Sequence, residues 1–156
     1  MKKIFSLLLI FAVASVSILF SSFTEAFAGT AAPITKVSID RISSDGVNWE
    51  SLNDSTGNSL AVKPIEGDTV YFRVTYTGIS NTNIFYNDTL NITNSGVINY
   101  QQVPITDSAK VVVGYQRYYS IPVSAFENGY KLRIHSYSAA GPKQADSNTV
   151  FFSLAQ

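Results

Sequence analysis

The chain of 156 residues has no cysteine, a single histidine, His135, and a single tryptophan, Trp49. The lack of cysteine excludes disulfide bonds, thiolate catalysis, zinc sites with sulfur ligands and lipid attachment at a cysteine. A small exported domain without disulfides must obtain its stability from its core. Such a composition is more typical of a bacterial exporter than of a eukaryotic one.

Charge is also scarce, because only 14% of the residues are charged and the formal net charge is +0 at pH 7. Once Lys2, Lys3 and Glu25 are set aside, residues 29–156 carry 9 basic and 10 acidic side chains, a formal charge of −1. Nucleic-acid-binding domains and proteins that bind anionic membranes normally show a basic surplus. We therefore expect neither nucleic acid nor a membrane surface as a partner of the mature chain.

The N-terminus has the three parts of a secretory signal peptide. Lys2 and Lys3 precede an apolar run over residues 4–20, and the small-residue triplet Ala-Phe-Ala follows at 26–28. A membrane anchor is the alternative, but a span needs roughly 20 apolar residues and this run is short and interrupted by serines. The sequence thus predicts a signal peptide at 1–28, one mature domain at 29–156, and a secreted or cell-surface location.

Apolar and polar residues alternate with a period of two over most of the chain after Pro33. The segment 69–77, TVYFRVTYT, is the clearest case, with Val70, Phe72, Val74 and Tyr76 on one face. Such alternation of β-branched and aromatic residues is typical of half-buried strands, and no segment has an apolar stripe at helical spacing. We expect strands at 34–42, 47–52, 59–64, 69–77, 83–92, 96–103, 110–121, 130–138 and 147–154. Short strands separated by turns predict an all-β antiparallel sandwich or barrel.

The C-terminal region resembles the last two strands of fibronectin type III domains. It holds Tyr130-x-Leu132-x-Ile134, a turn at 139–142 and the SNTV segment at 147–150, and 66–78 looks like an early core strand of immunoglobulin-like sandwiches. The resemblance covers 66–78 and about 118–154, and it implies a single antiparallel sandwich of about seven to nine strands. Trp49 lies before the 69–77 strand, which is not where such a domain places its core tryptophan.

No catalytic constellation is visible. A general base needs a positioned partner, and His135 has neither a second histidine nor a nucleophile elbow beside it in the sequence. Glycoside hydrolysis needs two facing carboxyl groups, but Glu66 and Glu127 lie in predicted turns. We therefore expect no catalytic residues, and the protein is predicted not to be an enzyme.

Metal binding has little support in the sequence. Without cysteine and with one histidine, only oxygen ligands remain, and these suit calcium. Acidic residues cluster at Asp45, Glu50 and Asp54 and at Glu66 and Asp68, but neither group follows an EF-hand pattern. Because aspartate is common in turns for backbone reasons alone, we expect no metal and no cofactor.

The first candidate binding surface lies on the outward face of the 130–138 strand. Alternation places Leu132 and Ile134 inward and Arg133, His135 and Tyr137 outward. In the last strand the same pattern turns Phe151 outward. If the two strands pair as in fibronectin type III domains, Phe151 comes near Tyr137 and His135, and Phe85 or Tyr86 can join from a third strand. Exposed aromatic side chains often mark a contact surface; the alternative is that His135 is an ordinary solvated strand residue.

The second candidate surface is the GYQRYY segment at 114–119. Tyr115, Arg117 and Tyr119 alternate there with Gln116 and Tyr118. Sugar rings stack on such aromatic side chains while arginine and amide groups bind hydroxyls. The competing interpretation is that most of these rings fill the core or cover neighbouring strands.

These features predict a secreted non-catalytic binding or adhesion module. Its partner would be a carbohydrate or cell-wall polymer, or an extracellular protein. The first alternative is a structural matrix protein that self-associates through the last strand, taken as an uncapped sheet edge. The second is a secreted toxin or antimicrobial factor in which the polar segment 80–108 forms a mobile hairpin.

Overall fold

A computed structural model of the chain describes residues 31–53, 57–127 and 129–155. The predicted signal peptide at 1–28 and Asp54 lie outside the described residues. Among the described residues, no helix is long and apolar enough to cross a membrane. Residues 34–152 supply a core of their own, with Phe72, Tyr76, Leu132 and Val150 among its buried side chains.

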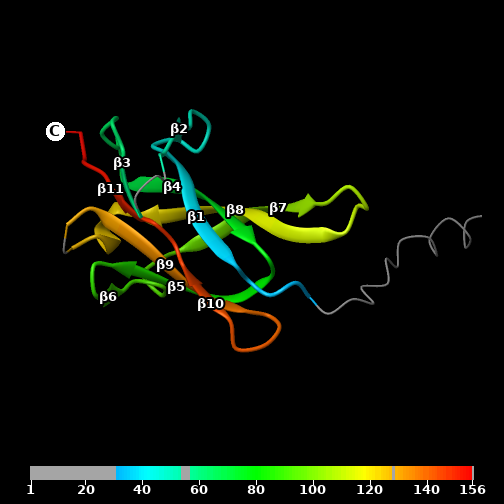
Figure 1. The fold of residues 1–156 in the computed structure, drawn as a ribbon. Coiled ribbons are helices and arrows are strands. Elements are labelled where there is room, and N and C mark those ends of the chain that lie inside the picture. Colours follow the sequence, from blue (N-terminus) through cyan, green and yellow to red (C-terminus); the bar gives the residue numbers. More distant parts are fainter. Residues whose placement is uncertain (1–30, 54–56, 128, 156) are drawn as a thin grey trace, which may run out of the picture. The chain divides into compact units, whose positions relative to one another are not determined.

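The described residues form eleven strands and one short 3-10 turn, η2 (Val123–Ala125). Figure 1 shows how the strands are arranged. The strands are β1 (Lys36–Ser43), β2 (Glu50–Ser51), β3 (Asn58–Leu60), β4 (Thr69–Thr77), β5 (Ser80–Asn87), β6 (Leu90–Asn91), β7 (Ile98–Thr106), β8 (Val112–Pro122), β9 (Lys131–Ser138), β10 (Gln144–Asp146) and β11 (Thr149–Phe151). The prediction of an all-β fold is confirmed. The strand count exceeds the expected seven to nine because β6 and β10 are too short to leave an alternating pattern in the sequence.

The strands form two sheets whose inner faces pack on each other. One sheet has the order β2-β1-β4-β8-β7, and the other has the order β3-β11-β9-β5-β6, with β10 paired to β9. All pairs are antiparallel except β3 with β11. Rings from the two sheets meet edge to face in the interior, Phe85 with Tyr119 at 4.9 Å and Phe72 with Phe152 at 5.8 Å between centroids. This two-layer arrangement is that of a β-sandwich.

Alternation sets the faces of the strands as the sequence predicts. In β4, Val70, Phe72, Val74 and Tyr76 are buried, and the residues between them are half-buried on the outer face. In β9 the side chains of Leu132, Ile134 and Ser136 point inward. The period of two therefore determines which side chains reach solvent on each sheet.

Asn148 ties the two sheets together between β10 and β11. Its side-chain oxygen accepts a hydrogen bond from the Ile39 amide at 2.8 Å, and its side-chain nitrogen donates to the Ile39 carbonyl at 2.9 Å. The same nitrogen donates to the Ser59 hydroxyl at 2.8 Å. Since Ile39 lies in β1 and Ser59 in β3, one buried amide links both layers.

The sheet edges differ from the prediction. The last strand, β11, lies between β3 and β9, so it is an inner strand and not the uncapped edge that the sequence analysis expected. Within the described residues, β7 is an edge strand of the five-stranded sheet, and its residues are exposed over most of its length. The segment 80–108 is built into both sheets, through β5 paired with β9 and β7 paired with β8.

Candidate functional site

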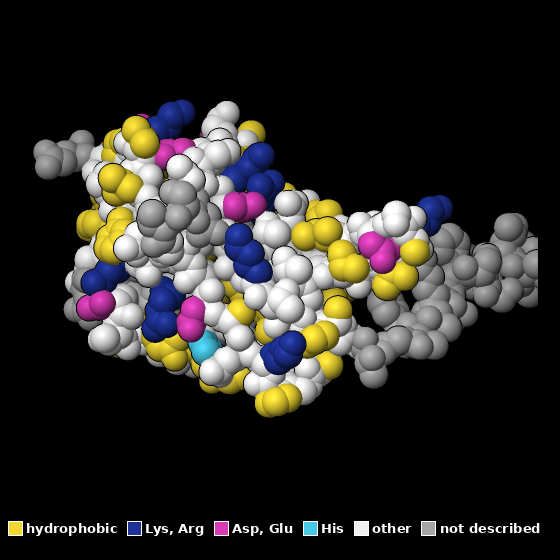
Figure 2. Space-filling model, in the orientation of Figure 1, with side chains coloured by type: hydrophobic (Ala, Val, Ile, Leu, Met, Phe, Trp, Pro, Cys, Tyr) yellow, Lys and Arg dark blue, Asp and Glu magenta, His cyan; other side chains and the backbone are white. Residues whose placement is uncertain are grey.

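The structure brings together three of the residues predicted on β9. Arg133, His135 and Tyr137 share the outer face, and Asp146 of β10 lies between the first two. One carboxylate oxygen of Asp146 is 2.9 Å from Arg133 Nη1 and 2.9 Å from His135 Nδ1. Figure 2 shows the single histidine beside one acidic and one basic side chain. We call these four residues, with Tyr86, the Asp146 cluster.

Aromatic rings complete the Asp146 cluster. The His135 and Tyr137 rings meet edge to face at 4.7 Å, and the Arg133 guanidinium lies 5.1 Å from the centre of the Tyr86 ring. Tyr86 of β5 pairs with Arg133, whereas its neighbour Phe85 points into the core. Of the two residues that the sequence left open, Tyr86 is therefore the one that joins. The charged groups of the Asp146 cluster pair with one another, and the Tyr137 side chain remains 41% exposed.

Phe151 does not join this cluster, and the expectation that it lies near Tyr137 and His135 is wrong. It is 39% exposed, as the alternation predicts, but its partner on β9 is Lys131. That position is six residues from Tyr137, or about 20 Å along the strand. The places beside His135 and Tyr137 are taken by Asp146 and Gln144 of β10, because the chain reaches β11 only after β10.

The second candidate surface turns out to face the interior. Tyr115, Arg117 and Tyr119 of β8 pair with Tyr76, Val74 and Phe72, which form the inner face of β4. Tyr119 is only 4% exposed, and its hydroxyl lies 3.1 Å from that of Tyr76. The competing interpretation, in which these rings fill the core, therefore holds for Tyr119.

Arg117 is bound within the same inner layer. Its guanidinium lies 5.0 Å from the Tyr76 ring centre and 5.6 Å from that of Tyr115. It donates to the Gln102 side-chain oxygen at 2.8 Å and to the Ser80 carbonyl at 3.0 Å. The Tyr76 ring, which Arg117 covers, and the neighbouring Tyr119 are both buried, and this burial raises the pKa of Tyr76 well above its usual value and also raises the pKa of Tyr119. These contacts hold the Arg117 side chain within the fold and leave it little freedom to meet a ligand.

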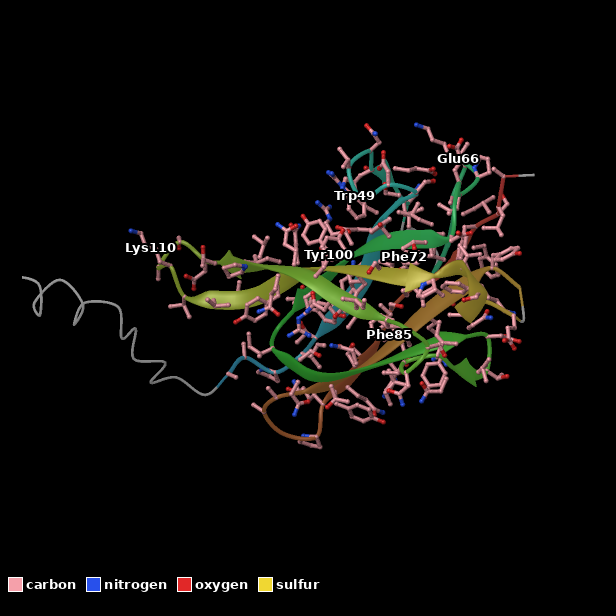
Figure 3. The ribbon with its side chains drawn as sticks, turned by 180° about the vertical axis from the view of Figure 1, so that it is seen from behind. Trp49, Glu66, Phe72, Phe85, Tyr100 and Lys110 are labelled. Atoms are coloured by element: carbon pink, nitrogen blue, oxygen red, sulfur yellow. The ribbon has the colours of Figure 1, made fainter. Side chains whose placement is uncertain are left out.

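The opposite face of the same sheet carries an aromatic cluster that the sequence analysis missed. It consists of Trp49, Tyr71, Tyr100 and Tyr118, and we call it the outer aromatic face. Ring centroids are 5.6 Å apart for Trp49 and Tyr118, 6.2 Å for Tyr118 and Tyr100, and 5.9 Å for Tyr100 and Tyr71. Tyr100 is the most exposed of the four, at 44%. Figure 3 shows Trp49 and Tyr100 together on one side of the five-stranded sheet, with Phe85 on the other.

The loop between β1 and β2 places Trp49 over the sheet. One carboxylate oxygen of Asp45 accepts hydrogen bonds from the amides of Val47 and Asn48, each at 2.8 Å, and from the Ser43 hydroxyl at 2.9 Å. These bonds, first those from Asn48 and Val47, hold the pKa of Asp45 well below its usual range. The carboxylate thus shapes the loop from within, and Trp49 follows directly after it.

A β-bulge positions Tyr100. The register of β7 against β8 shifts between Asn99 and Gln101, so Tyr100 is the extra residue of the edge strand. Bulges re-aim side chains, and here the ring contacts Tyr71 and Tyr118, both on the outer face. Burial, together with the neighbouring Tyr71 and Tyr118 hydroxyls, raises the pKa of Tyr100.

An ion pair lies next to the rings on the same face. Arg73 donates to Asp40 through Nε at 3.0 Å and Nη2 at 2.8 Å, and Thr75 donates to the same carboxylate at 3.0 Å. Asp40 is itself the extra residue of a bulge in β1. The hydrogen bonds from Arg73 to Asp40 raise the pKa of the guanidinium. The ion pair as a unit has no net charge.

Two acidic residues near the β1–β2 loop, Asp45 and Glu50, accept hydrogen bonds from backbone amides. They border an open groove of about 300 Å³ lined by Asp45, Asn48, Glu50, Lys63 and Glu66 among others. The Glu50 carboxylate accepts hydrogen bonds from the amides of Val62 at 2.6 Å and Lys63 at 3.0 Å. Among the described residues, no three acidic or histidine side chains are grouped so that they could hold a metal ion.

The chain belongs to a protein family described as "Domain of unknown function (DUF4879)", whose model matches residues 27–152. No curated protein matches it. The match covers every strand of both sheets, including the outer aromatic face and the Asp146 cluster.

Proposed function

We propose that this domain is a secreted, non-catalytic binding module that contacts an extracellular polymer or protein through its outer aromatic face. The observation that carries the proposal is the contiguous ring cluster of Trp49, Tyr71, Tyr100 and Tyr118 on the outer side of one sheet. Among the described residues, none of these four rings belongs to the buried core. Clustered tyrosine and tryptophan side chains are enriched at binding sites, since they combine a broad apolar surface with a polar tip.

The position of the cluster supports the proposal further. Three bonded elements hold the rings in place: the Asp45-ordered loop, the central strands and the bulge of β7. Rings that are fixed before a ligand arrives lose little conformational freedom on binding. The Asp146 cluster is the weaker candidate, because its charged groups already bind one another.

We also infer an immunoglobulin-like sandwich for the scaffold. In that fold, strands lettered in chain order form one sheet with the order A-B-E-D and another that contains C, F and G. The orders β1-β4-β8-β7 and β11-β9-β5 follow this scheme. They support the fibronectin type III resemblance of 66–78 and about 118–154, although Trp49 lies outside the core.

Export belongs to the same proposal. It rests on the charged, apolar and small-residue parts of 1–28, which have the order of a secretory signal peptide. Amino-terminal sequencing of the protein recovered from culture medium tests it. A mature N-terminus at Gly29 is expected, and protein found only inside cells at full length would contradict it.

Co-sedimentation with isolated cell walls and insoluble polysaccharides tests the binding role. Tyr100→Ala should reduce the bound fraction, whereas Tyr137→Ala should not. Tyr137 is a matched control, because it is 41% exposed, close to the 44% of Tyr100, but lies on the other sheet. Loss of binding only in Tyr137→Ala would move the site to the Asp146 cluster, and no binding by the unmodified protein would contradict the proposal.

Self-association is the second candidate function, and β7 rather than the last strand is the edge that favours it. The nine residues of β7 carry no charge, and charged side chains are one of the common protections of an exposed edge. Pro104 and the bulge at Tyr100 limit how far a second strand could pair with β7. Sedimentation velocity at rising concentration tests this role: a larger species that Val103→Lys abolishes would support it, and a monomer throughout would contradict it.

A further inference from the structure

We infer that the ligand of the outer aromatic face is a single, uncharged polysaccharide chain. The inference rests on the proposed function, since it names the chemical class that the same surface binds. Three features of the face carry it: the ion pair beside the rings, the angles between the rings, and the polar groups that alternate with them.

Charge is the first feature. The charged pair next to the rings, Arg73 with Asp40, is joined by two hydrogen bonds and shielded by a third from Thr75. A negatively charged ligand would have to compete with the Asp40 carboxylate for Arg73, and a positively charged ligand would have to displace Arg73. Separating such a pair is costly, because it leaves a partly buried charge without its partner. An uncharged ligand leaves the pair intact.

Ring orientation is the second feature. The planes of Trp49 and Tyr118 differ by 74°, those of Tyr118 and Tyr100 by 54°, and those of Tyr100 and Tyr71 by 86°. A flat crystalline polymer surface would need rings that lie in one plane. A free chain can rotate about its glycosidic bonds and so present successive sugar faces at different angles. The ring geometry therefore fits one chain and not a crystal face.

The third feature is the alternation of rings with neutral polar side chains. On the outer face, Tyr118 pairs with Gln101 of β7, and the next outward residue of β8, Gln116, pairs with Thr75 of β4. A sugar ring has an apolar face of C–H groups and a rim of hydroxyls. The C–H groups suit the negative face of an aromatic ring, and the hydroxyls suit amide and hydroxyl side chains.

A protein partner fits this surface less well. Stable protein interfaces bury roughly 800 Å² on each partner around an apolar centre that is depleted of charge. Here three of the four rings are half-buried against one another and the loop, and the ion pair lies beside them. On the strands of this sheet, the exposed large apolar side chains are those of Ile98, Tyr100 and Val103, all in β7.

Trp49 provides a direct readout, because it is the only tryptophan and lies in the proposed site. Purified protein would be titrated with solubilised cell-wall polysaccharide while the tryptophan emission is recorded. We expect a saturable change in emission that persists at 0.5 M salt, in the range where charge attraction is largely screened. Tyr100→Ala should weaken binding by about tenfold or more, as for a central aromatic contact. Tyr100→Phe, which keeps the ring, and Tyr137→Ala should bind within about twofold of the unmodified protein.

Treatment of the wall material separates this inference from the proposed function. Periodate, which cleaves vicinal diols of sugars, should abolish Tyr100-dependent binding, and protease digestion should leave it unchanged. Loss after protease but not after periodate would mean a protein ligand, which overturns the inference and leaves the proposed function in place. Loss in salt, or competition by a soluble polyanion, would overturn the uncharged class. Stronger retention on crystalline than on swollen polymer would overturn the single chain, and no binding to untreated walls would overturn both proposals.

Discussion

The outer faces of the two sheets have the same strand alternation but opposite chemistry. The outer aromatic face of the five-stranded sheet has four rings in mutual contact and one ion pair beside them. The six-stranded sheet instead has Lys131 paired with Asp88, and Arg133 and His135 both paired with Asp146. The first face offers a group of aromatic rings with one ion pair at its side, and the second offers charged groups that already pair with one another.

This difference shows that exposure alone does not identify a binding face. Tyr100 and Tyr137 are almost equally exposed, and each contacts another ring. The ring next to Tyr137 belongs to a histidine held by a carboxylate, whereas Tyr100 lies among further aromatic rings. A ligand gains more from the rings around Tyr100, because it meets several rings there without having to displace an ion pair.

The largest loss of stability is expected from the residue that holds the two sheets in register. Asn148→Ala removes three buried hydrogen bonds and leaves the amide and carbonyl of Ile39 without this partner. Urea denaturation should show the free energy of unfolding lowered by about 3 kcal/mol. Asn94→Ala, at an exposed position, is the control and should change it by less than about 0.5 kcal/mol. A loss below about 1 kcal/mol for Asn148→Ala would show that the sheets are held by their apolar contacts alone.

Removing one carboxylate from each outer face compares the two directly. Asp40→Ala leaves Arg73, whose side chain is 15% exposed, without its bidentate partner, and stability should fall by about 2 kcal/mol. Asp146→Ala acts on a carboxylate that is 51% exposed, and the loss should stay below about 1 kcal/mol. Equal losses in chemical denaturation would mean that the two ion networks are alike, and would remove the distinction between the faces.

The inner face of the five-stranded sheet makes stability fall at high pH. Burial raises the pKa of Tyr76 and of Tyr119 above the unfolded value of about 10. The folded state therefore keeps protons that the unfolded state loses, so their contribution is full below about pH 10 and declines as pH rises through the folded-state pKa values. Denaturation across this range should show a decline that is shallower in Tyr76→Phe. The same slope in both proteins would show that the Tyr76 hydroxyl has the same pKa in the folded and the unfolded state.

Much of the fold follows from the sequence, because alternation is a local property. The expected strand at 69–77 coincides with β4, and those at 130–138 and 34–42 lie within two residues of β9 and β1. Alternation also placed Arg133, His135 and Tyr137 on one outer face. The two-residue strand β6 and the three-residue strand β10 left no periodic signal, and their existence depends on pairing with β5 and β9.

The candidate site was predicted less well, because it depends on contacts between distant segments. In β8 the alternation of Tyr115, Arg117 and Tyr119 with Gln116 and Tyr118 is clear, but aromatic residues on both faces hide which face is inner. Ile121 carries the missing signal, since it shares a face with Tyr119 and is fully buried. No local pattern places Trp49 on Tyr118, because that contact requires the loop that Asp45 holds in shape.

The smallest effect is expected from alanine at one of two glycines. Gly46 lies in the loop between β1 and β2, and Gly141 lies in the turn between β9 and β10. Gly46 and Gly141 have φ of +72° and +76°, a region that costs other residues energy, so alanine at either should lower stability by about 1 kcal/mol. Only at Gly46 would the added Cβ meet a side chain, the Tyr71 ring at 3.2 Å, whereas at Gly141 nothing lies within 4 Å. Gly46→Ala should therefore shift Tyr71 against Tyr100 and change the emission of Trp49 in the same loop. Gly141→Ala should leave that emission as it is, and identical spectra for the two variants would show that the loop does not bear on the rings.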